Sequence, residues 1–74
     1  MVNGAMISTL PLQIDPRRIG YFKFILEGYD GMALLTTISA KDGDIIIRYP
    51  SLFHDDLLAI IDDVAPLIFK PHAE

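Results

Sequence analysis

The sequence predicts an α+β fold of the ferredoxin-like split βαβ type, with the order strand, helix, strand, strand, helix. Apolar residues alternate with a period of two in three short segments and with a helical period in two others. Gly, Pro and Asp separate these segments, as turns require. The chain has 74 residues, which is enough for one small domain. We expect this domain to span residues 6–69, with flexible ends at residues 1–5 and 70–74.

The first strand is expected at residues 6–14, where side chains alternate between two faces. Leu10, Leu12 and Ile14 share one of these faces. Pro11 interrupts the segment, and proline cannot donate a hydrogen bond to a neighbouring strand. We therefore expect this strand at an edge of the sheet, or bulged at Pro11.

The first helix is expected at residues 16–28. Asp15 can cap its N-terminus, and Pro16 suits the first helical position because no N–H is needed there. Gly28 can end the helix. Its apolar arc is wider than one packed face needs, and Phe24 lies beyond the part that a sheet and a second helix would cover.

Residues 32–39 and 44–49 are expected to pair as a hairpin, because Asp42-Gly43 between them is a strong turn signal. One face of each strand must then belong to the core. We assign Leu34 to the core and Leu35 to the opposite face. On the returning strand, Ile45, Ile47 and Tyr49 form one face, and Ile46 and Arg48 form the other.

The second helix is expected from residue 51 to at least residue 64, with Ser51 as its N-cap. Pro66 would remove a helical hydrogen bond and clash one turn back. The helix therefore either kinks there, or stops and releases residues 67–69 as a short last strand. The apolar stripe continues to Ile68, which favours the kinked helix. The predicted core comprises Phe22, Leu26, Leu34, Ile47, Leu57 and Ile61.

A right-handed crossover and a hairpin place these strands in the spatial order first, third, second. The expected fold is thus a three-stranded antiparallel sheet with both helices on one face. The fourth strand of a ferredoxin-like domain is short or missing.

The sequence also carries a family resemblance. The run IGYFKFILEGYDGMALLTTI, followed by KDGDIIIRYP and an apolar helix with an acidic face, resembles domain of unknown function family 4911, a family of small uncharacterised bacterial proteins. The resemblance covers roughly residues 14–68, and it implies no activity and no catalytic residues. The matching residues are Ile19, Phe22, Glu27, Tyr29, Thr36 and Gly43.

The first four elements are also loosely similar to an ACT-type ligand-binding domain. That family uses a glycine in the loop before its first helix to approach an amino acid. Here the loop is residues 15–18, and Gly20 lies inside the helix. This departure argues against amino-acid binding.

Composition narrows the range of functions. The formal net charge is −4 and the pI is about 4.8, which argues against nucleic acid as a partner. There is no cysteine, so disulfides and thiolate metal sites are excluded. No apolar run is long enough to span a membrane, and we see no signal peptide. We expect a soluble cytoplasmic protein.

Candidate chemistry is sparse. His54-Asp55-Asp56 is similar to a metal-binding doublet, but the other histidine is His72, near the C-terminal end. The remaining acidic pair of the second helix, Asp62-Asp63, extends a solvated acidic stripe. We therefore predict no metal, no cofactor and no enzymatic activity.

A small ligand site is the remaining candidate for chemistry. Glu27, Tyr29 and Asp30 cluster at the end of the first helix and could line a pocket with Arg48 or Tyr49. The simpler interpretation is that Tyr29 packs and Glu27 faces water, and we favour it because ligand sites are few in any protein.

The leading functional hypothesis is a non-catalytic module that self-associates, most simply as a homodimer, for assembly or protein interaction. A domain this small has a thin stability margin and no covalent staple. Leu35 and Ile46 would be exposed on a sheet face that the helices leave bare. Phe24 could add to the same contact or to another one. The alternative is an ACT-like sensor of an amino acid or other metabolite. Pairing through sheet faces and pairing through sheet edges both stay open.

Overall fold

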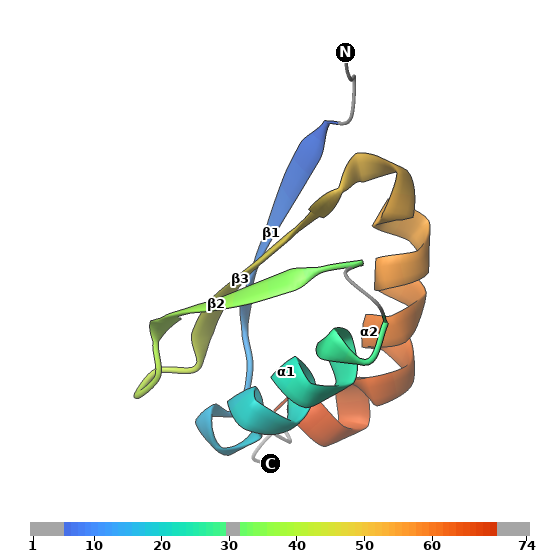
Figure 1. Cartoon of the computed structure of the whole chain (residues 1–74). Coiled ribbons are helices and arrows are strands. Elements are labelled where there is room, and N and C mark those ends of the chain that lie inside the picture. Colours follow the sequence, from blue (N-terminus) through green and yellow to red (C-terminus); the bar gives the residue numbers. More distant parts are fainter. Residues whose placement is uncertain (1–5, 30–31, 70–74) are drawn as a thin grey trace.

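Three strands and two helices follow one another in the predicted order (Figure 1). The structure, a computed structural model, describes residues 6–29 and 32–69. The predicted flexible ends lie outside the described residues. Short 3-10 turns precede both helices. The elements are β1 (Ile7–Gln13), η1 (Pro16–Arg18), α1 (Ile19–Glu27), β2 (Leu34–Ser39), β3 (Asp44–Pro50), η2 (Ser51–Phe53) and α2 (His54–Ile68).

The described strands form one antiparallel sheet in the order β1-β3-β2. Both helices lie on the same side of this sheet (Figure 1). The described residues contain no fourth strand, and α2 continues through Pro66 to Ile68. The predicted ferredoxin-like topology is therefore confirmed, and residues 66–68 are helical.

Asp15 joins the two ends of the fold. Its buried carboxylate accepts a hydrogen bond from the Arg17 backbone N–H at 3.0 Å, as the predicted N-cap should. The same carboxylate pairs with the Arg17 guanidinium at 2.9 Å, and this hydrogen bond and charge raise the pKa of Arg17. The backbone N–H of Asp15 donates to the carbonyl of Ile68 at 2.7 Å. The last turn of α2 is thus attached to the start of the first helix.

The β2–β3 turn depends on Gly43. Its φ is +77°, in the left-handed region that favours glycine. The Gly43 carbonyl accepts a hydrogen bond from the Ile14 N–H at 2.9 Å. The predicted turn is confirmed, and it also holds the end of β1.

The core lies between the sheet and the two helices. Five of the six predicted core residues are buried, but Leu34 is 59% exposed, and this part of the prediction is wrong. Leu35 pairs with Ile47 and is only 7% exposed, so it takes the core position instead. The buried core residues are Ile14, Phe22, Leu26, Leu35, Ile45, Ile47, Tyr49, Leu57, Ile60, Ile61 and Ile68.

Ser51 does not cap the second helix. It is the first residue of the 3-10 turn η2, and no side-chain cap is formed there. The Ser51 hydroxyl instead forms a hydrogen bond with the Ser8 hydroxyl of β1. The predicted N-cap is therefore wrong, because a partner distant in sequence binds this side chain.

Candidate functional site

The uncovered face of the sheet is the most distinctive surface of the described chain. Side chains alternate along each strand, so the face that turns away from the helices carries every second residue. Nothing in the described chain packs over it (Figure 1). We call this surface the open face. It comprises Ile7, Thr9, Pro11 and Gln13 of β1, Asp44, Ile46, Arg48 and Pro50 of β3, and Leu34, Thr36 and Ile38 of β2.

The strand register orders these side chains into rows. Ile46 pairs with Pro11 on one side and Thr36 on the other, so it lies in the middle of the open face. Arg48 lies in the next row, between Thr9 and Leu34. The open face therefore combines an apolar centre with one charged residue toward each end, Asp44 and Arg48.

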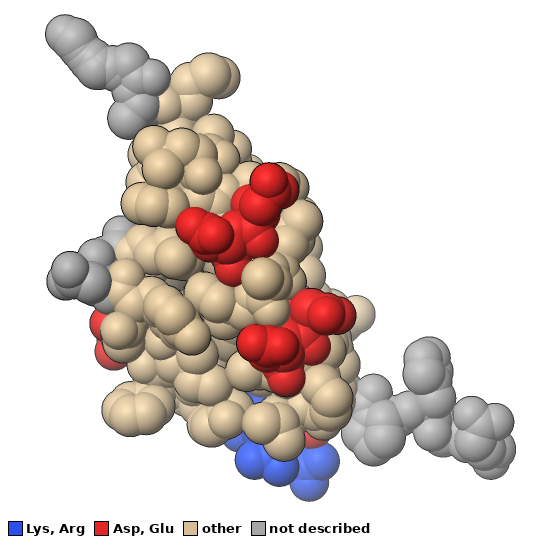
Figure 2. Space-filling model, turned by 90° about the vertical axis from the view of Figure 1, so that its right-hand side faces the viewer, with Lys and Arg blue, Asp and Glu red and all other residues tan. Residues whose placement is uncertain are grey.

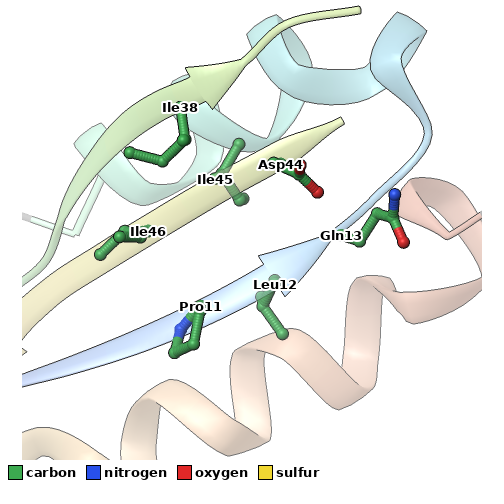
Figure 3. Close-up of a pocket in the computed structure, with 7 residues that line it drawn as sticks. All are labelled: Pro11, Leu12, Gln13, Ile38, Asp44, Ile45 and Ile46. Atoms are coloured by element: carbon green, nitrogen blue, oxygen red, sulfur yellow. The ribbon is translucent and has the colours of Figure 1, made fainter. Parts of the chain in front are cut away.

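A first hollow lies at the Asp44 end of the open face (Figure 3). Its volume is about 350 Å³, and its lining is mostly apolar. Figure 3 shows lining residues contributed by all three strands. The hollow carries one carboxylate, that of Asp44. It is lined by Pro11, Leu12, Gln13, Ile38, Asp44, Ile45 and Ile46.

A second hollow lies at the Arg48 end. Its volume is about 500 Å³, and its lining is again mostly apolar. It carries one guanidinium, that of Arg48. The two hollows share no lining residue, so they are separate depressions. The second one is lined by Ile7, Met32, Ala33, Leu34, Arg48, Tyr49 and Pro50.

The structure brings together two of the predicted site residues, Ile46 and Arg48, as neighbours on the open face. Leu35 does not join them. The sequence places it on this face, but it is buried beneath the helices, and Leu34 occupies the open face in its place. The predicted alternation along β2 was shifted by one residue, and a shift of one residue moves every side chain of a strand to the other side of the sheet.

The other predicted site residues belong to the helix layer. Phe24 on α1 is 75% exposed, and Glu27 and Tyr29 at the end of the same helix are exposed as well. None of them lines the hollow that contains Arg48. Because α1 packs on the covered side of the sheet, these residues and Ile46 face different directions.

His54 has a partner that sequence reasoning missed. The Tyr49 hydroxyl and His54 Nδ1 lie 2.6 Å apart, and the two rings stack with centroids 5.8 Å apart. Tyr49 is buried and also borders the second hollow. The spacing of five residues around the Pro50-Ser51 turn is the signal that could have suggested this contact.

The acidic residues of α2 face solvent. Asp55 and Asp56 lie in its first turn, where carboxylates interact well with the helix dipole. Figure 2 shows the acidic side chains in two separate patches on the side of the molecule that α2 forms. Across residues 6–29 and 32–69, no three His, Cys, Asp or Glu side chains are grouped closely enough to hold a metal ion. His72 and Asp30 lie outside the described residues.

No helix in the described part of the chain is both long enough and apolar enough to cross a membrane.

Comparison with known proteins identifies the family of this chain. A family model described as "Domain of unknown function (DUF4911)" matches residues 12–68. No curated protein and no solved structure matches the chain. The matched segment begins near the end of β1 and includes β2, β3 and both helices in full.

Proposed function

Because this chain belongs to the DUF4911 family, for which no function is defined, its own surface must indicate its role, and we propose that it is a non-catalytic module that self-associates through the open face. Its unit of function would be a homodimer that serves assembly or protein interaction. One observation carries the proposal: the helices cover one side of an apolar sheet and leave the other side bare.

The exposure of individual side chains supports this role. Ile7, Leu34 and Ile38 on the open face are 61%, 59% and 60% exposed, and Pro11 is exposed beside the half-buried Ile46. A sheet that is apolar on both sides is normally covered on both. An exposed patch of this kind commonly marks a protein interface. A second copy of the chain would supply the missing layer.

The sheet edges favour contact between faces rather than between edges. Ile14 N–H donates to Gly43, and Ser51 N–H donates to Met6, so even-numbered residues of β1 form the hydrogen-bonded pairs with β3. The backbone groups of Pro11 therefore point to the free edge of β1, where proline has no N–H to donate. Edge pairing through β1 would lack that hydrogen bond.

The other free edge is irregular too. The pairing of β2 with β3 shifts between Thr37 and Ser39, which is a bulge. Bulges twist an edge strand and disfavour its pairing with another chain. Both edges are thus protected, and among the surfaces of the sheet itself the open face remains available for association.

The charges of the open face support a non-catalytic role. General acid–base catalysis needs its groups within hydrogen-bond reach of one reacting centre. Asp44 lines one hollow and Arg48 the other, so they do not converge on a common centre. The cysteine-free sequence is in keeping with a reducing compartment such as the cytoplasm.

The size of the face sets the expected strength of the contact. Strands of seven, six and seven residues, about 4.8 Å apart and at about 3.3 Å per residue, give a face of roughly 320 Å² per copy. This is smaller than a standard interface, which buries about 800 Å² per partner. We therefore expect a dissociation constant in the micromolar range.

Sedimentation velocity from about 5 to 500 µM tests the proposal, a range chosen around the micromolar affinity expected. The parent chain should change from monomer to dimer across it, and Ile46→Lys should stay monomeric. Phe24→Lys is the matched control, because it places the same charge on an exposed apolar site of the helix layer. It should associate like the parent. A parent that stays monomeric throughout, or a dimer lost with Phe24→Lys but kept with Ile46→Lys, would overturn the proposal.

A second candidate function has a specific observation in its favour. The 500 Å³ hollow has the size of a small-molecule site, and Arg48 could pair with a carboxylate there. Metabolite sensing of the ACT-like kind would need such an anchor. A panel of amino acids and other apolar carboxylates should then raise the melting temperature of the parent but not that of Arg48→Gln. No shift with any of them would leave only self-association.

A further inference from the structure

The order of charges along β3 specifies how two copies would meet. Asp44, Ile46 and Arg48 follow one another on the open face of the central strand. The carboxylate and the guanidinium are therefore separated by four residues, or about 13 Å, with the apolar Ile46 between them. Neither charge forms an ion pair with any described residue of its own chain.

We infer that two copies stack their open faces with their β3 strands antiparallel, so that Asp44 of each copy pairs with Arg48 of the partner subunit. This inference rests on the proposed self-association and deepens it. Each dimer would contain two such ion pairs, one on either side of a two-fold axis that passes between the two Ile46 side chains.

Two-fold symmetry limits the alternatives. In a symmetric dimer the same patch is used by both copies, so it must be complementary to itself. If the β3 strands ran parallel across the interface, Asp44 would face its own equivalent, and so would Arg48. Like charges in an interface cost affinity. Reversing one strand about Ile46 turns both repulsive contacts into attractive ones.

The two hollows fit the same arrangement. Asp44 lines the 350 Å³ hollow and Arg48 lines the 500 Å³ hollow. Antiparallel stacking places each hollow over the unlike one, and therefore each carboxylate over a guanidinium. Parallel stacking would place two carboxylates in one shared space and two guanidiniums in the other.

Sheet twist is compatible with both ion pairs. Stacked sheets usually cross at about 30°. Each charged residue lies about 6.6 Å from the axis along the strand, so this angle moves it sideways by only about 3 Å. The long Arg48 side chain can cover that distance, so both pairs can form at once.

Charge exchange tests the inference. Asp44→Arg and Arg48→Asp should each weaken the dimer about ten- to a hundred-fold, because two attractive pairs become repulsive. The double variant Asp44→Arg/Arg48→Asp should regain the parent affinity, since each pair is only reversed. An equimolar mixture of the two single variants should also associate, as a heterodimer with both pairs intact.

Matched controls remove the effect of net charge. Asp63→Arg on α2 and Arg18→Asp on η1 change the charge equally, at exposed sites off the open face. Both should keep the parent dissociation constant in sedimentation velocity.

The outcomes separate this inference from the proposed function. If the parent dimerises through Ile46 but Asp44→Arg binds as tightly as the parent, the antiparallel arrangement is wrong while self-association stands. The antiparallel arrangement is also wrong if the double variant stays as weak as the single ones. If the parent is monomeric at every concentration, the proposed function itself fails.

Discussion

Two glycines should respond in opposite ways to the same added methyl group. At Gly43, a Cβ would lie 1.8 Å from the carbonyl oxygen of Ile14, far inside contact distance. The φ of +77° is also unfavourable for any residue with a Cβ. At Gly20, inside α1, a Cβ would meet nothing within 4 Å. Gly43→Ala should therefore destabilise the fold, and Gly20→Ala should stabilise it.

The magnitude for Gly43→Ala follows from three contributions. The left-handed backbone costs about 1–2 kcal/mol once a Cβ is present. Loss of the 2.9 Å hydrogen bond from Ile14 N–H to the Gly43 carbonyl adds about 1 kcal/mol. The overlap of the added Cβ with the Ile14 carbonyl forces the backbone to move, which is a third unfavourable contribution beyond these two. The free energy of unfolding should fall by at least about 3 kcal/mol, a large part of the roughly 4–11 kcal/mol expected for a chain this short.

Gly20→Ala supplies the control. Alanine in place of glycine within a helix contributes about 0.5–1 kcal/mol. Thermal unfolding, followed by circular dichroism at one fixed protein concentration, measures both variants. In a domain of this size 1 kcal/mol shifts the melting temperature by about 4–8 °C, so Gly43→Ala should melt at least about 12 °C lower and Gly20→Ala a few degrees higher. A Gly43→Ala protein that melts within about 4 °C of the parent, less than the effect of 1 kcal/mol, would refute the reasoning about this turn.

Three further predictions concern neighbouring groups. Leu35→Ala should lower the free energy of unfolding in urea by about 2–5 kcal/mol. Leu34→Ala, measured at a concentration where the chain is monomeric, should lower it by about 0.5 kcal/mol or less. Equal losses for the two variants would contradict the strand register. Asp15→Ala should lower the free energy of unfolding by about 2 kcal/mol in the same assay. Asp15→Asn should lower it clearly less, because asparagine still caps the Arg17 N–H. An unchanged urea midpoint for Asp15→Ala would argue against the cap. Tyr49→Phe removes the hydroxyl that is hydrogen-bonded to His54, and it should lower the free energy of unfolding by about 1 kcal/mol. An unchanged free energy of unfolding would show that this contact does not stabilise the fold.

The element order was predictable because the chain changes its apolar period clearly. The period changes from two to the helical value at Asp15 and again at Ser51, and Gly43 marks the turn between two strands. Asp15 and Gly43 have the cap and turn roles expected of them. The face of β2 was not predictable in the same way. Leu34 and Leu35 are adjacent and equally apolar, so composition cannot choose between them. The pairing of Leu35 with Ile47 decides, and pairing is a long-range property.

The candidate site was predictable in part for the same reason. Ile46 and Arg48 follow a regular alternation on β3, so their common face could be inferred from the sequence. The role of Pro11 at that surface depends on which backbone groups point outward, and this requires the register with β3. The local sequence favours Ser51 as a helix cap. Its actual hydrogen bond is to Ser8, which is distant in sequence, so no local pattern could have indicated it.

The hydrogen bond from Asp15 N–H to the Ile68 carbonyl has a consequence for how the domain opens. It connects two buried residues separated by most of the described chain, so it is lost when the last turn of α2 separates from the segment that follows β1. Fraying of the last turn of α2 must release the start of the first helix at the same time. Native-state hydrogen exchange should therefore protect this amide to nearly the full free energy of global unfolding, although it lies at the end of a strand. A single amide could then report the cooperative opening of the entire domain.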